Sequence, residues 1–254
     1  MILDDFRLDG DAALVTGASR GLGRAMAQAL AEAGADVAVT ARSAQALGDV
    51  AEAVRTRGRR SIAIAADVTA EEDLDRIVRE TLGEFGKIDI LVNNVGATAR
   101  YPAEDFPLEE WDRVMAVDVR SVFSLTKRVV SSMKATGGGR IINTASLLSE
   151  IGVPLIPPYA ASKGAIRQMT KAWAVEWAKY NIRVNAIGPG YMRTEMTEGL
   201  YQDRERYEKV MSRVAIKRWG TPGDVKGAVV YLASRASCYV TGQVIYIDGG
   251  WLAG

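Results

Sequence analysis

Tyr159 and Lys163 stand four positions apart in the stretch PPYAASKGA (157–165), in a chain that contains no histidine. Any proton chemistry near neutral pH therefore needs another base. A free phenol has a pKa of about 10. An ammonium about 4 Å away, at an effective dielectric constant near 20, favours the phenolate by about 4 kcal/mol. Residues four apart share one helix face, so the pair suffices for acid–base catalysis, although the bare spacing also occurs by chance.

Ser146 ends a run of strand-like residues, 140–146, shortly before the helical stretch that carries Tyr159. Its hydroxyl could hold a substrate oxygen while a hydride moves, or it could only cap a loop. The first interpretation is favoured because serine, tyrosine and lysine accompany a candidate nucleotide-binding turn.

That turn is TGASRGLG (16–23), which follows the first predicted strand and opens a helix. Gly17, Gly21 and Gly23 allow a tight turn and a close approach of the backbone to a pyrophosphate. The N-terminus of the following helix offers free N–H groups to the phosphates. A glycine-rich turn alone is a weak signal, but the strand–turn–helix context favours dinucleotide binding over turn geometry alone.

The end of the second predicted strand indicates which dinucleotide is bound. An acidic residue there would accept hydrogen bonds from the adenosine ribose and repel a 2′-phosphate. This chain has VTARS instead, ending in Arg42, and places Arg20 inside the glycine turn. Two guanidinium groups can clamp a phosphate, so we expect NADP(H), although each arginine alone could be a solvent-exposed side chain. Asp67, after the third strand, could cap the next helix or accept a hydrogen bond from adenine.

Short apolar runs alternate with longer helical patterns along the whole chain. Strands are predicted at 12–16, 36–41, 61–67, 89–94, 140–146, 183–188 and 243–248, and helices at 23–34, 44–58, 71–86, 108–134 and 159–180. This alternation predicts a doubly wound α/β fold of the Rossmann type, a seven-stranded parallel sheet with helices on both faces. We expect one domain, 1–254, with a charge-rich segment at 191–221 that is either a solvated helical face or a lid.

The amino-acid composition argues against several classes of function. The chain has 254 residues, 32 basic and 31 acidic, and a formal charge of +1, so no overall field recruits nucleic acid or an anionic membrane. The single cysteine, Cys238, excludes an internal disulfide and is interpreted as structural. No zinc site is expected without histidine, although carboxylates could bind magnesium. The start lacks a signal-peptide pattern and no apolar run approaches the ~20 residues of a membrane span, so we expect a cytoplasmic protein.

Taken together, these residues resemble the classical short-chain dehydrogenase/reductase family over essentially the whole chain. The landmarks, in order, are TGASRGLG, NNVG (93–96), Ser146, YAASK (159–163), PGYMRT (189–194) and DGG (248–250). The resemblance implies hydride transfer between a nicotinamide and an alcohol/carbonyl pair. Tyr159 would exchange the proton, Ser146 would orient the substrate oxygen, and Lys163 would assist the tyrosine and hold the nicotinamide ribose.

The resemblance also implies a set of cofactor-binding residues beyond the glycines and arginines already named. These are Ser19, Leu22, Asp67, Val68, Asn93, Asn94, Gly96, Tyr159, Lys163, Pro189, Gly190, Met192 and Thr194. Family members are tetramers that pack two long helices against a partner's copies, so a homotetramer is implied. Trp173 and Trp177 could serve that interface, with a place in the core as the default.

The chain departs from the family pattern at two positions. Val95 stands where alanine is usual, a small packing change, and Asp118 stands where asparagine is common. The family residue helps to seat a water that connects the lysine to solvent. A carboxylate could accept from that water or pair with Lys163, so we expect Asp118 to take part in catalysis and to alter its pH dependence.

For the substrate, SLLSEIGVP (146–154), GPGY (188–191) and DGGWLAG (248–254) are similar to gluconate 5-dehydrogenases and other sugar-acid dehydrogenases of the family. Arg100 could meet a substrate carboxylate or be a surface residue. Acyl-carrier-protein ketoreductases and broad carbonyl reductases share almost all of these motifs and remain alternatives. A non-catalytic nucleotide-binding homologue is disfavoured because the serine, tyrosine and lysine are all present.

Overall fold

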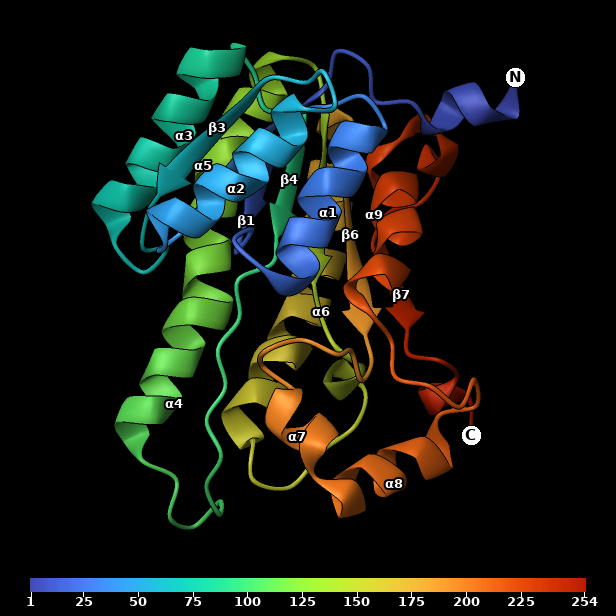
Figure 1. The fold of residues 1–254 in the computed structure, drawn as a ribbon. Helices are drawn as coiled ribbons and strands as arrows, with labels where there is room; N and C mark the ends of the chain where they lie inside the picture. The colour runs from blue at the N-terminus through green and yellow to red at the C-terminus, as the bar shows by residue number, and fades with distance from the viewer.

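Seven strands form one parallel sheet in the computed structural model, which describes residues 1–254 (Figure 1). The strands are β1 (Ala12–Thr16), β2 (Asp36–Ala41), β3 (Ser61–Ala65), β4 (Ile90–Asn93), β5 (Gly139–Thr144), β6 (Ile182–Pro189) and β7 (Val244–Ile247). Their order is β3-β2-β1-β4-β5-β6-β7, and each neighbouring pair is parallel. The order reverses between β1 and β4, which is where ligands bind in sheets of this kind.

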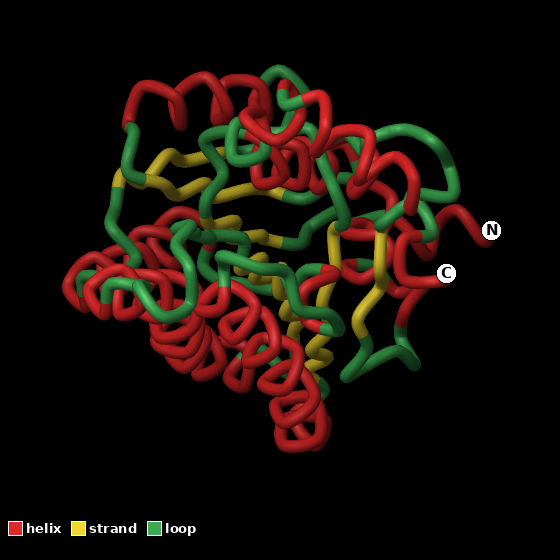
Figure 2. The backbone as a smooth tube through the Cα atoms, turned by 90° about the horizontal axis from the view of Figure 1, so that it is seen from below, coloured by secondary structure: helices red, strands yellow, loops and turns green.

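Two helical layers cover the sheet, as Figure 2 shows in a view from below. One layer contains α1 (Gly21–Glu32), α2 (Ala44–Arg55) and α9 (Lys226–Ala233), which share one buried apolar cluster. The other contains α3 (Glu71–Phe85), α5 (Ser121–Ala135) and α6 (Pro157–Trp177), which share a second. The predicted fold class is therefore confirmed, and most strand boundaries lie within two residues of those expected.

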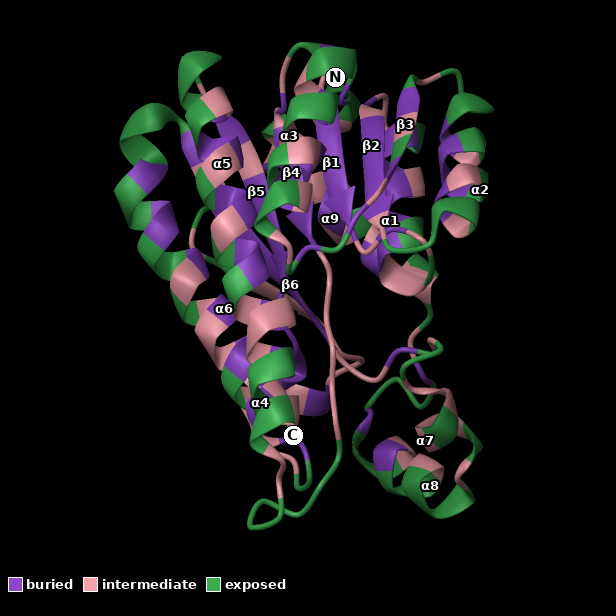
Figure 3. Cartoon of the chain, turned by 90° about the vertical axis from the view of Figure 1, so that its left-hand side faces the viewer, coloured by how far each residue is buried: buried purple, intermediate pink, exposed green.

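The central strands are buried on both faces, as their continuous apolar sequences predict (Figure 3). Leu14 of β1 pairs with Ala38 of β2 on one side and Leu91 of β4 on the other, and Leu14 and Leu91 are fully buried. Such packing fixes where each strand ends. The carboxyl ends of β1, β4, β5 and β6 therefore present their loops along one edge, where the candidate site lies.

The predicted long helix at 108–134 is interrupted. It consists of α4 (Leu108–Met115), a π-helical turn η2 (Ala116–Arg120) and α5, and the Ser121 amide donates to the Ala116 carbonyl across the wide turn. Asp118 lies inside this turn and is fully buried. Wide turns of this kind occur often at functional sites, and periodicity alone does not reveal them.

The segment 191–221 carries α7 (Glu198–Gln202) and α8 (Arg204–Arg213), which lie beyond the carboxyl ends of the strands (Figure 1). Its two ends are joined, because Met192 bridges to Gly220 and the Gly220 amide donates to the Tyr191 carbonyl at 3.0 Å. The remaining short 3-10 turns are Ile2–Phe6, Leu147–Ser149, Ala178–Tyr180, Pro222–Val225, Arg235–Ser237 and Trp251–Ala253.

Several remaining sequence expectations concern packing. Trp173 and Trp177 are buried and stacked, with ring centroids 5.3 Å apart, so the core interpretation of these residues is confirmed. Cys238 is exposed and contributes nothing to the core, so the interpretation of this residue as structural is wrong. No helix of the chain combines the length and apolar character needed to cross a bilayer.

Candidate active site

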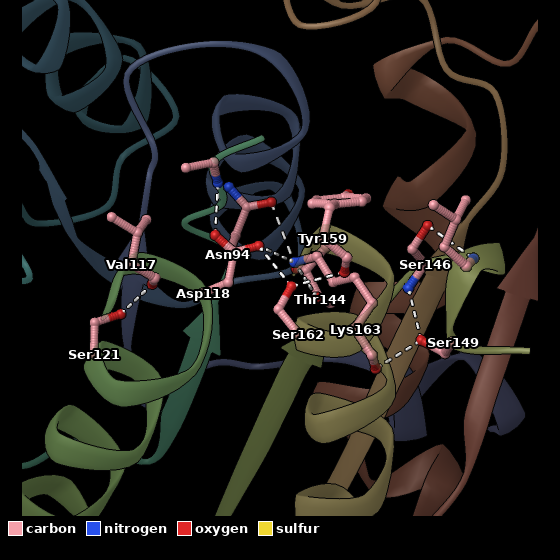
Figure 4. A network of polar contacts seen from close by, with 12 residues as sticks. Asn94, Val117, Asp118, Ser121, Thr144, Ser146, Ser149, Tyr159, Ser162 and Lys163 are labelled. Carbon is pink, nitrogen blue, oxygen red and sulfur yellow. Dashed lines mark hydrogen bonds and ion pairs between the residues drawn. The ribbon is translucent and has the colours of Figure 1, made fainter. Parts of the chain in front are cut away.

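Tyr159 and Lys163 lie on the first turns of α6, which begins with Pro157 and Pro158 (Figure 4). Proline is favoured at a helix start because its missing N–H would be unpaired there anyway. The Lys163 amine lies 5.3 Å from the centroid of the Tyr159 ring and donates to the Thr144 carbonyl at the end of β5, at 3.1 Å. The lysine is buried and the tyrosine only partly so, which leaves the phenol accessible to a ligand.

Asp118 completes a buried polar group around the lysine. One carboxylate oxygen lies 3.4 Å from the Lys163 amine and accepts from the Ser162 hydroxyl at 3.3 Å, and the other accepts from the Ala97 amide at 2.6 Å (Figure 4). Gly96 adjoins the pair, since a Cβ there would lie 3.6 Å from the amine. Of the two roles expected for Asp118, the structure shows the ion pair.

The charge of Lys163 depends on this pair. Burial by itself lowers the pKa of a lysine, because it removes the ammonium from water. At Lys163 the attraction of Asp118, with a smaller contribution from Tyr159, outweighs burial, and the pKa is raised above the ordinary value. The amine therefore stays protonated at neutral pH in a place where an unpaired lysine would tend to lose its proton.

Ser146 follows β5 and is buried, with its hydroxyl accepting a hydrogen bond from the Leu148 amide at 3.2 Å. The hydroxyl donates to no protein acceptor, so its own proton is available to a ligand. Ser149 ties this segment to α6, because its hydroxyl accepts from the Ser146 amide at 3.3 Å and donates to the Lys163 carbonyl at 2.8 Å. Ser149 thus links the segment of Ser146 to the helix that carries Tyr159 and Lys163.

The glycine turn has the geometry of a phosphate cradle. Gly17 and Gly21 adopt positive φ angles of 62° and 54°, which favour glycine. A Cβ at Gly23 would lie 2.2 Å from the Gly17 carbonyl oxygen, so α1 can pack this closely onto the turn only with glycine there. No side chain caps the start of α1, which leaves its first N–H groups for a ligand. These residues fit the pyrophosphate of a dinucleotide.

Asn94 holds the turn in place. Its amide group donates to the carbonyls of Thr16 and Gly17 at 3.3 and 3.2 Å, and its backbone N–H donates to the Thr16 hydroxyl at 2.9 Å. Asn93 has a different role, because its side chain donates to Thr126 at 3.0 Å and Asn143 at 2.9 Å inside the core. Of these two asparagines, only Asn94 contacts the glycine turn through its side chain.

Two further residues of the expected cofactor set, Val68 and Met192, direct their side chains into the apolar core. Asp67 is exposed and accepts from the Thr69 amide and hydroxyl at 2.9 and 2.7 Å, which closes a local turn before α3. The predicted capping of α3 by Asp67 is wrong, because the cap position is Ala70 and no side chain caps that helix. The second carboxylate oxygen of Asp67 makes no hydrogen bond and is free for an adenine.

The arginines expected at the 2′-phosphate have different surroundings. Arg42 follows β2, is exposed and has no ion-pair partner. Arg20 forms an ion pair with Glu195, a residue of the segment after β6 that the sequence pattern did not single out. Thr194 lies beside Gly21, as a Cβ there would be 3.7 Å from its methyl carbon. The segment after β6 thus reaches the glycine turn.

Close packing fixes the end of β6. A Cβ at Gly190 would lie 2.6 Å from the Asp248 Cα, so the PG pair of the sequence allows β6 to approach the segment after β7. Thr194 is held by Thr197, whose hydroxyl accepts from the Thr194 amide at 3.0 Å. The segment carrying Thr194 is therefore ordered beside the cradle.

Arg100 is exposed and has no carboxylate partner, but it lies within electrostatic range of Tyr191. Burial raises the pKa of Tyr191, and the positive charges of Arg100 and Arg213 oppose that rise. Sequence reasoning included Tyr191 only as part of the motif GPGY (188–191), and it missed Arg213, because no spacing pattern links residue 100 to residue 213.

The comparisons with known proteins agree with this geometry. A family model described as enoyl-(acyl carrier protein) reductase matches residues 17–252. The chain is 44% identical to 2-dehydro-3-deoxy-D-gluconate 5-dehydrogenase of Dickeya dadantii over 100% of both chains. It is 40% identical to gluconate 5-dehydrogenase of Gluconobacter oxydans, with 97% of this chain and 96% of that protein covered. The crystal structure of a gluconate 5-dehydrogenase from Burkholderia cenocepacia in complex with NADP and tartrate matches at a TM-score of 0.96 and 38% identity, with 100% of both chains covered.

The chain belongs to the short-chain dehydrogenase/reductase family. The family expected from the sequence motifs is confirmed.

Proposed function

We propose that this chain is an NADP(H)-dependent oxidoreductase that interconverts a secondary alcohol and a carbonyl in a sugar acid such as gluconate. The observation that carries the proposal is the charged Lys163 amine beside Tyr159, at the strand edge next to the glycine turn. A chain without histidine needs such a base, and the pair supplies one.

In this mechanism the bound nicotinamide supplies or accepts the hydride. The Ser146 hydroxyl donates a hydrogen bond to the substrate oxygen. This hydrogen bond holds the substrate oxygen in place and polarises its bond to carbon. Tyr159 removes the hydroxyl proton during oxidation and returns it during reduction. The Lys163 ammonium favours the phenolate electrostatically, and Asp118 keeps that ammonium charged despite its burial.

The preference for NADP(H) rests on the residues around the adenosine end. Arg42 is unpaired and exposed after β2, where no carboxylate repels a 2′-phosphate. Arg20 lies in the turn itself and can exchange its protein partner for a phosphate. The related gluconate 5-dehydrogenase of known structure is a complex with NADP.

The sugar-acid substrate rests on the relatives, which are named as 5-dehydrogenases of gluconate and of 2-dehydro-3-deoxy-D-gluconate. Arg100 supports a substrate with a carboxylate, because it is a cation without a protein partner beside this site. We further propose that the segment 191–221 forms the lid over the substrate, since it joins the glycine turn through Thr194 and Glu195.

A side-by-side assay tests the substrate class. Gluconate with NADP⁺ and 5-keto-D-gluconate with NADPH should be turned over faster than a 3-oxoacyl thioester is reduced with NADPH. The reverse ranking would assign the chain to acyl-carrier-protein or broad carbonyl reduction. No turnover with any of these pairs would instead favour a non-catalytic nucleotide-binding protein.

We also propose a homotetramer assembled through the helices α4–α5 and α6. Phe123 of α5 is half exposed next to the buried Trp173, and Val175 of α6 is 84% exposed. These apolar side chains support an interface along the two helices, and light scattering at micromolar concentration tests it. The single exposed thiol of Cys238 suits a reducing compartment, which supports the cytoplasm as location.

A further inference from the structure

Arg213 differs from every other arginine of the segment 191–221. The other four, Arg193, Arg204, Arg206 and Arg218, each lie within ion-pair distance of a carboxylate. Arg213, the last residue of α8, has no such partner and makes no side-chain hydrogen bond. Among the arginines of this segment, one guanidinium is therefore left available for an external anion.

A cluster of tilted and edge-on aromatic rings supports this guanidinium. Its central carbon lies 4.7 Å from the centroid of the Trp251 ring. The Trp251 ring in turn lies 4.7 Å from that of Tyr191, which packs against Trp219 at 5.5 Å. This cation–π contact places the guanidinium over the ring, and its N–H groups, which make no hydrogen bond within the protein, are free for a planar carboxylate.

Arg213 and Arg100 belong to distant parts of the chain, and both lie within electrostatic range of Tyr191. Arg100 follows β4 and Arg213 ends α8, yet the charges of both act on the same partly buried hydroxyl. Neither arginine has a carboxylate partner, so an anion bound near Tyr191 would be attracted by both charges.

Tyr191 packs against the same apolar cluster as the catalytic tyrosine, Tyr159. Trp219 and Trp251 are buried in an apolar cluster against which both Tyr159 and Tyr191 pack. Leu147 and Leu148 of that cluster follow Ser146 directly. The indole N–H groups of Trp219 and Trp251 are buried without an acceptor, so the layer beneath the arginine also has donors that no protein group satisfies.

We propose that Arg213 is a substrate-binding residue which, with Arg100, binds the carboxylate of an acyclic sugar acid. Ser146 and Tyr159 hold the reacting hydroxyl, and α8 contacts the charged end of the same molecule. The inference rests on the proposed function and deepens it, because it assigns the acid group to a residue of the lid.

The test compares Arg213→Gln with the wild type on D-gluconate with NADP⁺ and on 5-keto-D-gluconate with NADPH. We expect KM to rise at least tenfold for both acids while kcat changes less than threefold, and Arg213→Lys to recover part of the loss. Arg204→Gln is the matched control: it makes the same charge change at the other end of α8, about 14 Å away, and should leave KM unchanged.

A second measurement separates binding from turnover. D-Gluconate and its uncharged analogue D-glucitol are titrated calorimetrically into the NADP⁺-loaded Tyr159→Phe protein, with and without Arg213→Gln. The Kd of gluconate should rise at least tenfold with Arg213→Gln, and the weak binding of glucitol should not change. Equal loss for both ligands would assign Arg213 a purely structural role and overturn the proposal.

The outcomes distinguish this inference from the proposed function. If the wild type turns over no sugar acid, the proposed function fails and the carboxylate site with it. If the wild type turns over gluconate while Arg213→Gln keeps its KM, the proposed function stands and only the role of Arg213 is overturned.

Discussion

The carboxylate of Asp118 lies 3.4 Å from the amine of Lys163, and both side chains are almost completely excluded from solvent. The carboxylate is held independently by the Ala97 amide and the Ser162 hydroxyl, so the pair is a fixed part of the site. Because Asp118 raises the pKa of Lys163, removal of its charge must change the pH at which the lysine loses its proton.

Asp118→Asn should move the pH dependence of activity downward. Asparagine keeps an acceptor for the Ala97 amide but removes the negative charge. That charge raises the pKa of Lys163, whereas burial lowers it. The Lys163 ammonium would then act on Tyr159 without a neighbouring negative charge, and it would lose its proton at lower pH. We expect the alkaline limb of the kcat/KM profile for alcohol oxidation, where the Lys163 ammonium loses its proton, to move down by about one pH unit. A profile superimposable on that of the wild type would show that Asp118 does not influence the base.

The same variant should lose stability at neutral pH. A lysine whose pKa is raised by folding stabilises the folded state below its unfolded pKa of about 10.4, and this contribution disappears as the pH rises through the folded value. Urea denaturation should therefore show a loss of up to about 3 kcal/mol for Asp118→Asn at pH 7, shrinking above pH 10 to 11. A difference that is constant across this range would contradict the assignment to Lys163.

Tyr159→Phe should abolish turnover and leave NADPH binding intact. The phenol is the group that exchanges the substrate proton in the proposed mechanism, and the ring beside Lys163 is retained in the variant. We expect kcat to fall at least a thousandfold while the Kd for NADPH, measured by the fluorescence of the reduced nicotinamide, changes less than threefold. Residual turnover within tenfold of the wild type would remove Tyr159 from the mechanism.

Gly23→Ala should disrupt the glycine turn, because the new methyl group would overlap the Gly17 carbonyl oxygen. NADPH affinity should fall at least tenfold, and the melting temperature should also fall. Gly48→Ala is the control, since Gly48 lies inside α2 with open space around it and alanine is the better helix former by about 1 kcal/mol. The control should keep cofactor binding and melt at the same or a higher temperature. Equal NADPH binding by both variants would contradict the predicted cradle.

The Arg20–Glu195 ion pair should tune the cofactor preference. Glu195→Gln frees Arg20 for a 2′-phosphate, so the Kd for NADPH should fall two- to fivefold, consistent with the value of about 1 kcal/mol or less for an exposed pair. Arg42→Gln should instead raise the Kd for NADPH more than tenfold. Neither change should alter the Kd for NADH, because that cofactor lacks the phosphate. Parallel shifts for both dinucleotides would argue against a role at the 2′-phosphate.

Local sequence patterns were sufficient for the sheet, the glycine turn and the Tyr159–Lys163 pair. The apolar strands, the turn at 16–23 and the spacing on α6 are properties of neighbouring residues, so helical and strand periodicity determine them. The residue types of the motifs also indicated the family, which the relatives confirm.

Tertiary structure decided which of the motif residues meet. Asn93 and Asn94 are adjacent in the sequence, yet Asn93 donates to Asn143 inside the core and Asn94 donates to Gly17 of the glycine turn. The reason is that successive side chains of a strand point to opposite faces. The pairing of Asp118 with Lys163 depends on the π-helical turn in one helix facing the first turns of another. The contacts of Glu195 with Arg20 and of Arg213 with Trp251 join segments remote along the chain, so only packing of the whole molecule brings them together.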